Sequence, residues 1–297
     1  MMLPIWFGSP IAFVYGIVVG SFLNVCIYRL PADESIVTPP SHCPKCNTKL
    51  KGVDLVPLFS FLLLGRKCRY CGVPISWRYF CVELLTGIMF VSIYLRYHFS
   101  IDFYAYILFG SALLIAFFVD LDCFIIPDQV PVIGIIIGIV KDIAHWIMGD
   151  LKLVHIPLPF TGFRLPAPPS ILGMVVCFGV FYLIAWVSFY VFRPKDEKER
   201  ENYEGAIGGG DVKLAAAIGA VVGALPALVS FFIAVLLGTI VGVTYVVLQA
   251  RAEKKGMPWR TEIPFGPYMV AGAFAVILAQ PQLFALWQAW VKLITPG

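Results

Sequence analysis

Two segments of the chain carry carboxylates at places where a pair of acids could act on a peptide bond. Asp120 follows a long apolar stretch, and Asp211 follows three glycines and precedes another apolar stretch. Two carboxylates in a partly dry site cannot easily both ionise, so they share one proton. One can then deprotonate a water molecule while the other polarises a scissile carbonyl. This is the chemistry of aspartyl peptide hydrolysis, which needs neither a metal nor a covalent intermediate.

The residues around Asp211 could hold a peptide backbone beside such a pair. Gly208 and Gly210 carry no side chain, so another backbone can approach them closely, and Lys213 follows in the same segment. We therefore predict that Gly208, Gly210 and Lys213 form a substrate loop. A phosphate loop is disfavoured, because the Gly-x-x-x-x-Gly-Lys-Ser/Thr pattern is not present. Taken singly, Asp211 could instead cap a helix, and Asp120 could be an interfacial charge.

Four of the eight cysteines form two Cys-x-x-Cys pairs that are typical of a zinc site. Cys43 and Cys46 make the first pair, and Cys68 and Cys71 make the second. Four thiolates complete the tetrahedral coordination of Zn²⁺, which leaves no open position and makes the zinc structural. Free thiols or two disulfides are the alternatives, and a reducing cytoplasm disfavours disulfides. The other four cysteines lie in or beside apolar stretches, where we expect them to be buried.

Long apolar stretches must position all of these groups. Hydrophobic residues make up 60% of the 297 residues and charged residues only 13%, whereas soluble domains have roughly 25% charged residues. A soluble enzyme, a disordered tail and a nucleic-acid-binding domain are all poor fits, and the lipid bilayer is the expected partner. We predict an all-α polytopic membrane protein of about eight spans. The predicted spans are residues 11–28, 80–95, 103–119, 130–147, 171–192, 212–225, 227–249 and 266–279.

Positive charges gather in three loops that alternating spans place on one face. Eight Lys and Arg lie in residues 29–78, five in 193–213 and four in 251–260. The positive-inside rule makes this face cytoplasmic and puts both termini outside. The cysteine loop and both aspartates then lie at the cytoplasmic face, so Asp120 and Asp211 can meet.

These elements suggest a division of the chain by role. Residues 1–30 would form the first membrane helix, residues 31–79 a small cytoplasmic zinc-binding domain, and residues 80–297 the catalytic membrane domain. A loop of about fifty residues is too small to build a sizeable core, so it would depend on its zinc to fold.

The sixth predicted span is too short for a bilayer. Its fourteen residues reach about 21 Å as a helix, against about 30 Å of hydrocarbon. We therefore predict irregular backbone at the preceding glycines, which is tolerated only where it lines a wet or protein-buried cavity. In other spans, small residues four apart, such as Gly16 with Gly20 and Gly134 with Gly138, predict close packing of helices.

Taken together, these features resemble the type IV prepilin peptidase family of aspartyl membrane proteases. The resemblance covers most of the chain. It rests on residues 20–31, the two Cys-x-x-Cys pairs, Glu-Leu-Leu-Thr-Gly at 83–87, Asp120 seven residues before Pro127-Asp128, and Gly-x-Gly-Asp at 208–211. The chain departs from many relatives at Asp122-Cys123, where they have Asp-His, and in its longer 149–169 segment.

The resemblance implies a substrate and two activities. Asp120 and Asp211 would cut the basic leader from precursors of type IV pilins or type II secretion pseudopilins at the bacterial inner membrane. Members with the cysteine loop also methylate the new N-terminal residue from S-adenosylmethionine. Glu83 would then line the methyl-donor site. The alternative is that Glu83 has a structural role, either as a neutral group or in an ion pair with Arg78. The acidic residues of 197–204 could attract the basic leader.

The two aspartates are expected to have different roles. Asp211 lies at a helix N-terminus, where the macrodipole favours an anion, so we assign it the ionised form and Asp120 the protonated one. The competing interpretations are a related membrane aspartyl protease with another helical substrate, a proton-coupled transporter, and a zinc adaptor without chemistry. A transporter would favour acidic residues at the bilayer midplane and internal repeats, and neither pattern is evident in the sequence.

Overall fold

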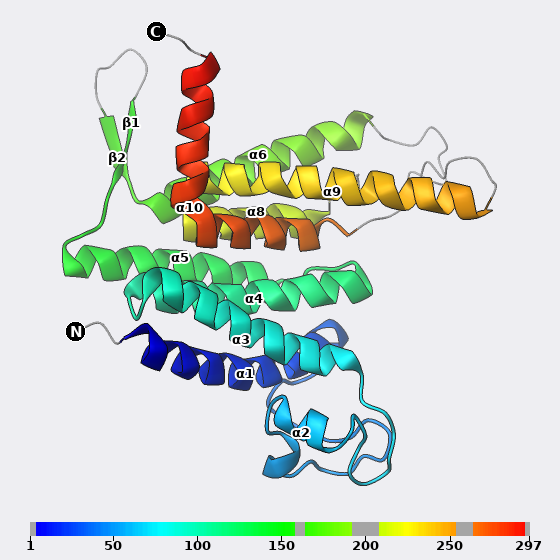
Figure 1. Ribbon diagram of the computed structural model, residues 1–297. Helices are drawn as coiled ribbons and strands as arrows, with labels where there is room; N and C mark the ends of the chain where they lie inside the picture. Colours follow the sequence, from blue (N-terminus) through cyan, green and yellow to red (C-terminus); the bar gives the residue numbers. More distant parts are fainter. Residues whose placement is uncertain (1–3, 158–163, 192–207, 254–263, 295–297) are drawn as a thin grey trace. The chain divides into compact units, whose positions relative to one another are not determined.

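Long helices make up most of the computed structural model, which describes residues 4–157, 164–191, 208–253 and 264–294 (Figure 1). Six of the described helices are long and apolar enough to cross a membrane. The chain divides into two compact units, Met1–Pro127 and Asp128–Gly297. The predicted division by role at residues 30 and 79 stays a prediction, and residues 197–204 lie in a segment outside the described residues.

The first unit contains three long helices and the cysteine loop. The helices are α1 (Ile5–Arg29), α3 (Trp77–Tyr97) and α4 (Ile101–Cys123), and each packs against the other two. A Cβ atom added at Gly16 would lie 2.7 Å from the Cα of Gly87, and one at Gly20 would lie 2.8 Å from the Cα of Glu83. The predicted packing role of these two glycines is therefore confirmed, and α1 lies against α3 at backbone distance.

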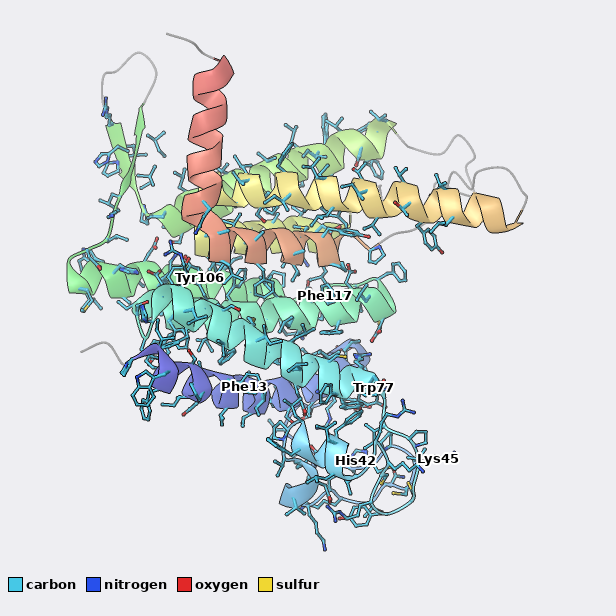
Figure 2. All side chains as sticks on the ribbon, viewed as in Figure 1. Phe13, His42, Lys45, Trp77, Tyr106 and Phe117 are labelled. Atoms are coloured by element: carbon cyan, nitrogen blue, oxygen red, sulfur yellow. The ribbon has the colours of Figure 1, made fainter. Side chains whose placement is uncertain are left out.

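The loop between α1 and α3 contains three short helical turns. They are η1 (Leu30–Ala32), η2 (Gly52–Asp54) and α2 (Phe59–Leu63). Phe61, on α2, is buried, and its ring centroid lies 5.3 Å from that of Trp77 and 5.4 Å from that of Phe80. The loop is therefore packed onto the first turn of α3, where Figure 2 labels Trp77.

In its described residues, the second unit is a bundle of five helices with a β-hairpin. Its helices are α5 (Gln129–Met148), α6 (Pro169–Val191), α8 (Gly209–Val222), α9 (Ala224–Glu253) and α10 (Gly266–Ile294). Strands β1 (Val154–Pro157) and β2 (Arg164–Ala167) pair antiparallel, with Val154 opposite Ala167. The segment between α5 and α6 is thus ordered as a hairpin in its described part.

One predicted boundary was wrong. The sixth predicted span ran to residue 225, but α8 ends at Val222, and Gly223 breaks the helix with a φ of +88° before α9 begins. A side chain at this φ would be strained, which is why the break falls on a glycine. Hydropathy cannot mark this break, because the residues on both sides of Gly223 are apolar.

Helix α8 is short but enclosed by protein. It contacts α5, α6, α9 and α10, and Leu214, Ile218 and Val221 are fully buried. A helix of 14 residues reaches about 21 Å, which is shorter than the hydrocarbon core. Lipid would leave the backbone N–H and C=O groups at its ends without hydrogen-bond partners, whereas neighbouring helices can supply partners. The predicted irregular backbone is wrong at Gly209 and Gly210, because both lie in the first turn of α8. The cavity that these glycines would line stays a prediction.

Two adjacent charges on α5 hold the ends of the neighbouring helices. Lys141 Nζ donates to the carbonyl oxygen of Val221 at 2.5 Å, at the C-terminal end of α8. The buried Asp142 carboxylate accepts from the backbone N–H of Ser170 at 2.8 Å, in the first turn of α6. The C-terminal end of a helix carries unpaired carbonyl groups with a partial negative charge, and the N-terminal end carries unpaired N–H groups with a partial positive charge. The lysine and the aspartate therefore each face a helix end of opposite sign. These contacts explain two charges inside an apolar helix and fix the axial position of α8.

Candidate catalytic aspartates and cysteine centre

Asp120 is held in the last turn of α4. It is 5% exposed, and its carbonyl oxygen accepts from the backbone N–H of Phe124 at 2.9 Å, where a positive φ ends the helix. Two residues later, Asp122 forms an ion pair with Nη1 of Arg78 in the first turn of α3. This ion pair ties the turn that carries Asp120 to the neighbouring helix.

Asp211 lies in the first turn of α8. Gly208 is the N-cap residue, and its carbonyl oxygen accepts from the Asp211 backbone N–H at 3.1 Å. Asp211 is therefore not the N-cap residue itself, but its carboxylate lies where it can interact with the helix N-terminus. The Asp211 side chain is half-buried, which leaves part of it open to another molecule.

Two of the glycines before Asp211 have room for a side chain. Gly208 and Gly209 are exposed, and Gly208 has an ordinary φ of −68°. Among the described residues, a Cβ atom at Gly209 would meet nothing within 4 Å, and one at Gly208 would meet only an Asp211 oxygen at 3.6 Å. An alanine at either position would therefore clash with none of the described residues. This surface suits the close approach of a peptide backbone, as the sequence predicts.

Lys213 has a partner within the protein. Its Nζ lies 2.6 Å from Oδ1 of Asp128, the N-cap residue of α5, and both side chains are more than half exposed. Each candidate aspartate is thus followed two residues later by a charge that pairs with another helix. The meeting of Asp120 with Asp211 stays a prediction, because they belong to different compact units.

Reversing one charge of the Lys213–Asp128 pair is expected to lower activity modestly, and reversing both charges is expected to restore it. We expect Lys213→Glu or Asp128→Lys to slow turnover of the peptide substrate by roughly two- to fivefold, because exposed ion pairs contribute little. The double variant, with both charges reversed, should recover most of the rate in an initial-rate assay. A much larger loss in Lys213→Glu that the reversed pair does not recover would mean that Lys213 contacts the substrate directly.

The four predicted metal ligands lie together. The Sγ atoms of Cys43, Cys46, Cys68 and Cys71 are all within 4.8 Å of one another, and all four residues are free cysteines. Cys43 Sγ and Cys71 Sγ are 3.8 Å apart. A tetrahedral metal site with metal–sulfur bonds of about 2.3 Å places its sulfurs about 3.8 Å apart. The cluster therefore fits one metal ion, and the disulfide alternative is wrong.

The two Cys-x-x-Cys turns share one backbone geometry. Cys43 N–H donates to the Thr48 carbonyl at 3.0 Å, and Cys68 N–H donates to the Val73 carbonyl at 2.9 Å. Each turn has a left-handed residue directly after its second cysteine, with a φ of +55° at Asn47 and +70° at Gly72. Asn and Gly are the residues that adopt this conformation most readily. This local signal was available in the sequence and supports the pairing of the turns around one centre.

The surroundings of the cluster favour a thiolate at Cys46 and hold the two turns together. The hydroxyl and backbone N–H of Thr48 lower the pKa of Cys46 to about 6. The Asp54 carboxylate accepts from Arg69 Nε at 2.6 Å, from the Tyr70 hydroxyl at 2.9 Å and from the Lys51 N–H. Its contact with Arg69 holds the pKa of Asp54 below its usual value. Asp54 thus links the 51–54 segment to the second turn.

Two buried charged side chains fasten the cysteine loop to the helices. The Glu83 carboxylate accepts from the backbone N–H of Leu58 at 2.7 Å, and Leu58 has a φ of +60°. Arg29 donates to the carbonyl oxygens of Ser35 at 2.8 Å and Pro39 at 2.7 Å. The alternative ion pair of Glu83 with Arg78 is wrong, because Arg78 pairs with Asp122.

The other four cysteines were only partly predicted. Cys26 and Cys177 are buried, as expected, but Cys81 and Cys123 are exposed on the protein. Their position in or beside an apolar stretch does not decide burial, because a membrane helix presents part of its surface to lipid rather than to neighbouring helices.

Comparisons with known proteins place both groups of site residues in matched regions. Residues 14–97, which include the four clustered cysteines, match the bacterial peptidase A24 N-terminal domain. Residues 107–243, which include Asp120 and Asp211, match the type IV leader peptidase family.

Characterised relatives align with nearly the whole chain. A prepilin leader peptidase/N-methyltransferase of Myxococcus xanthus is 36% identical over 99% of this chain and 98% of its own length. Enzymes of the same name from Xanthomonas campestris and Bacillus subtilis are 32% and 29% identical, over 91% and 90% of this chain and 90% and 93% of their own lengths. No solved structure matches the chain.

Proposed function

The chain belongs to the type IV leader peptidase family, and from this premise we propose that it cleaves prepilin leader peptides and methylates the new N-terminal residue. S-adenosylmethionine is the methyl donor that this activity implies. The observation that carries the proposal is the end-to-end similarity to a bifunctional relative, which includes both the aspartate and the cysteine segments. Type IV prepilins and type II secretion pseudopilins are the proposed substrates.

For the cleavage step, we propose Asp120 and Asp211 as the catalytic pair. Asp211 lies in the first turn of α8, where the helix dipole favours an anion, and Asp120 lies in the last turn of α4, where it disfavours one. Asp211 would take a proton from water as the water oxygen bonds to the scissile carbonyl carbon, while Asp120 protonates the carbonyl oxygen. The proton on Asp211 then passes to the departing amine as the C–N bond breaks, and a hydroxyl of the gem-diol returns a proton to Asp120 as the new carboxyl group forms.

The substrate would lie along the open glycines, Gly208 to Gly210, so that its backbone reaches Asp211. Gly208 and Gly209 are exposed and Gly210 is half-buried, and no described residue would clash with a Cβ atom at Gly208 or Gly209, which supports a role in binding. Lys213 would border this loop. Its ion pair with Asp128 supports a role in which the Lys213 ammonium group holds the substrate loop in place.

The metal of the cysteine centre is proposed to be zinc with a structural role. Four thiolates from Cys43, Cys46, Cys68 and Cys71 would hold it, and they leave no open coordination position for a substrate. When bound, zinc supplies folding free energy to the loop and takes no part in the chemistry.

For the methyl-transfer step, we propose Glu83 as a wall of the methyl-donor site, in addition to its contact with Leu58. A buried carboxylate at the junction of the loop and the helices is suited to a cationic sulfonium ligand. Glu83→Gln keeps an oxygen for the Leu58 N–H but removes the charge. We expect it to weaken S-adenosylmethionine binding by roughly tenfold, measured by calorimetry.

A second variant separates the two roles of Glu83. Hydrogen exchange at the Leu58 amide should stay near the wild-type rate in Glu83→Gln and rise in Glu83→Ala, because only Ala removes the acceptor. Donor binding at wild-type strength in Glu83→Gln would restrict Glu83 to holding the loop and would move the donor site elsewhere.

In the membrane, we propose eight spans with the cysteine loop and both aspartates at the cytoplasmic face and both termini outside. Six described helices are long enough to span, and α8 and the Gly266–Ala279 part of α10 would complete the set. The distribution of Lys and Arg supports this orientation. The similarity to bacterial prepilin peptidases supports the inner membrane as the location.

The proposal is tested by the intact mass of a prepilin incubated with purified enzyme and S-adenosylmethionine. The expected product has lost its leader and gained the mass of one methyl group. Removal of the leader without methylation in the presence of the donor would restrict the function to peptidase. An unchanged precursor, tested over several prepilins and pseudopilins, would overturn the assignment.

A further inference from the structure

The cysteine loop presents an apolar surface that the described protein does not cover. Residues on and around α2 form this surface, with Leu63 84% and Phe59 61% exposed. We call it the α2 surface, and its members are Val53, Val56, Phe59, Leu62 and Leu63. Helix α2 therefore has two apolar sides, because Phe61 on its other side is buried against Trp77 and Phe80. A water-facing loop gains nothing from such an outer side.

The packing of Phe61 on Trp77 and one hydrogen bond of Leu58 set the level of α2 along the membrane helices. The N-cap residue of α2, Leu58, donates its backbone N–H to Glu83, six residues into α3 from Trp77. Six residues of helix correspond to about 9 Å. Helix α2 therefore lies beside the first turns of α3, inside the Trp77–Tyr97 segment that is apolar enough to span. Figure 1 shows it next to the ends of α1 and α3 that carry the loop.

Basic and aromatic side chains border this surface. Lys51, Arg66 and Lys67 are exposed, and the Arg66 guanidinium lies 5.8 Å from the centre of the Trp77 ring. Trp77 is itself half-exposed at the start of its helix. Tryptophan is enriched at the membrane interface, and Lys and Arg beside an apolar face are attracted to anionic lipid headgroups. The surface thus combines apolar side chains at interface depth with cations at its edge.

We propose that α2 is an interfacial helix, with the α2 surface inserted among the lipids of the cytoplasmic leaflet and Arg66 and Lys67 at the phosphates of anionic lipids. Burial of exposed apolar side chains in the acyl region supplies the free energy, and the basic residues select an anionic leaflet. The Glu83–Leu58 contact fixes the depth of insertion. This inference rests on the proposed membrane topology.

Site-specific photo-crosslinking tests the inference without destabilising substitutions. A benzophenone amino acid is placed at Leu63 on the α2 surface, at Lys45 between two metal ligands, and at Val235 on the exposed side of α9. Lys45 lies away from α2 within the loop in Figure 2. The enzyme is reconstituted in nanodiscs of phosphatidylethanolamine and phosphatidylglycerol and irradiated. Phospholipid adducts are then counted by intact mass, and zinc content confirms a folded loop.

We expect the yield of lipid adducts at Leu63 to approach that at Val235 and to exceed that at Lys45 by roughly tenfold. Adducts at Val235 with no excess at Leu63 over Lys45 would overturn the inference and leave the membrane topology standing. Adducts at neither Leu63 nor Val235 would overturn both. Crosslinking of Leu63 to added prepilin in preference to lipid would also overturn the inference, since the surface would then be a substrate contact.

Discussion

Prepilin cleavage is expected to be lost when either Asp120 or Asp211 is replaced by Asn, with a fall in rate of at least roughly 10³-fold for each. Asn has nearly the shape of Asp, so both helix ends should keep their structure. It can neither accept a proton from water nor share one with a neighbouring carboxylate. Because the reaction needs both functions at once, the double variant should be no slower than either single variant.

The measurement is the intact mass of the precursor after incubation with each variant. Asp122→Asn is the matched control, because Asp122 lies two residues from Asp120 and pairs with Arg78. Its loss should loosen the end of α4 and slow cleavage by only severalfold. A precursor that has already lost its leader should still be methylated by both Asn variants. Cleavage that survives in Asp120→Asn and Asp211→Asn would show that the catalytic pair is misassigned.

The parts of the site that depend on local sequence were predictable. The cysteine cluster follows from two Cys-x-x-Cys turns, each of which fixes its own geometry within six residues. The positions of Asp120 and Asp211 at helix ends follow from the apolar stretches that they border. In both cases the spacing of residues along the chain is sufficient, because the local backbone geometry of a turn or a helix determines where each side chain lies.

The contacts that hold these residues in place could not be read from the sequence. Arg78 and Asp122 are 44 residues apart, and Lys213 and Asp128 are 85 apart. Charge alone allowed Arg78 to pair with Glu83, and that alternative was wrong. The partner is decided by the rotation and axial position of packed helices, which depend on many residues at once. The Glu83 contact was missed for another reason, since its partner is a backbone N–H and carries no signature in the side chains.

The membrane helices show the same limit. Hydropathy located the long helices, but it placed the end of the sixth span at residue 225 instead of Val222, because Gly223 interrupts a uniformly apolar run. The shortness of α8 was predicted, but its consequence was not. Irregular backbone was expected at the glycines, whereas Gly209 and Gly210 are helical and α8 is enclosed by α5, α6, α9 and α10.

Removal of the metal is expected to affect methylation far more than cleavage. In Cys46→Ser, the loop loses a ligand of its metal centre, and structural zinc contributes on the order of 10 kcal/mol to the folding of such small domains. The segments fastened by Arg29, Glu83 and Asp54 would then lose their common framework. The helices that carry the two aspartates bury side chains of their own, such as Leu113 on α4 and Ile218 on α8. Those helices should therefore assemble without the loop.

The experiment compares zinc content, cleavage rate and methylation rate for Cys46→Ser and for wild-type enzyme treated with a chelator. Cys81→Ser is the matched control, because Cys81 is a free, exposed cysteine outside the cluster. We expect the control to keep its zinc and both activities. The Cys46 variant should lose zinc and at least roughly tenfold in methylation, while cleavage changes by less than about threefold. Equal loss of both activities in a folded, zinc-free enzyme would mean that the loop also positions the substrate for cleavage, and the loop would then belong to the peptidase site.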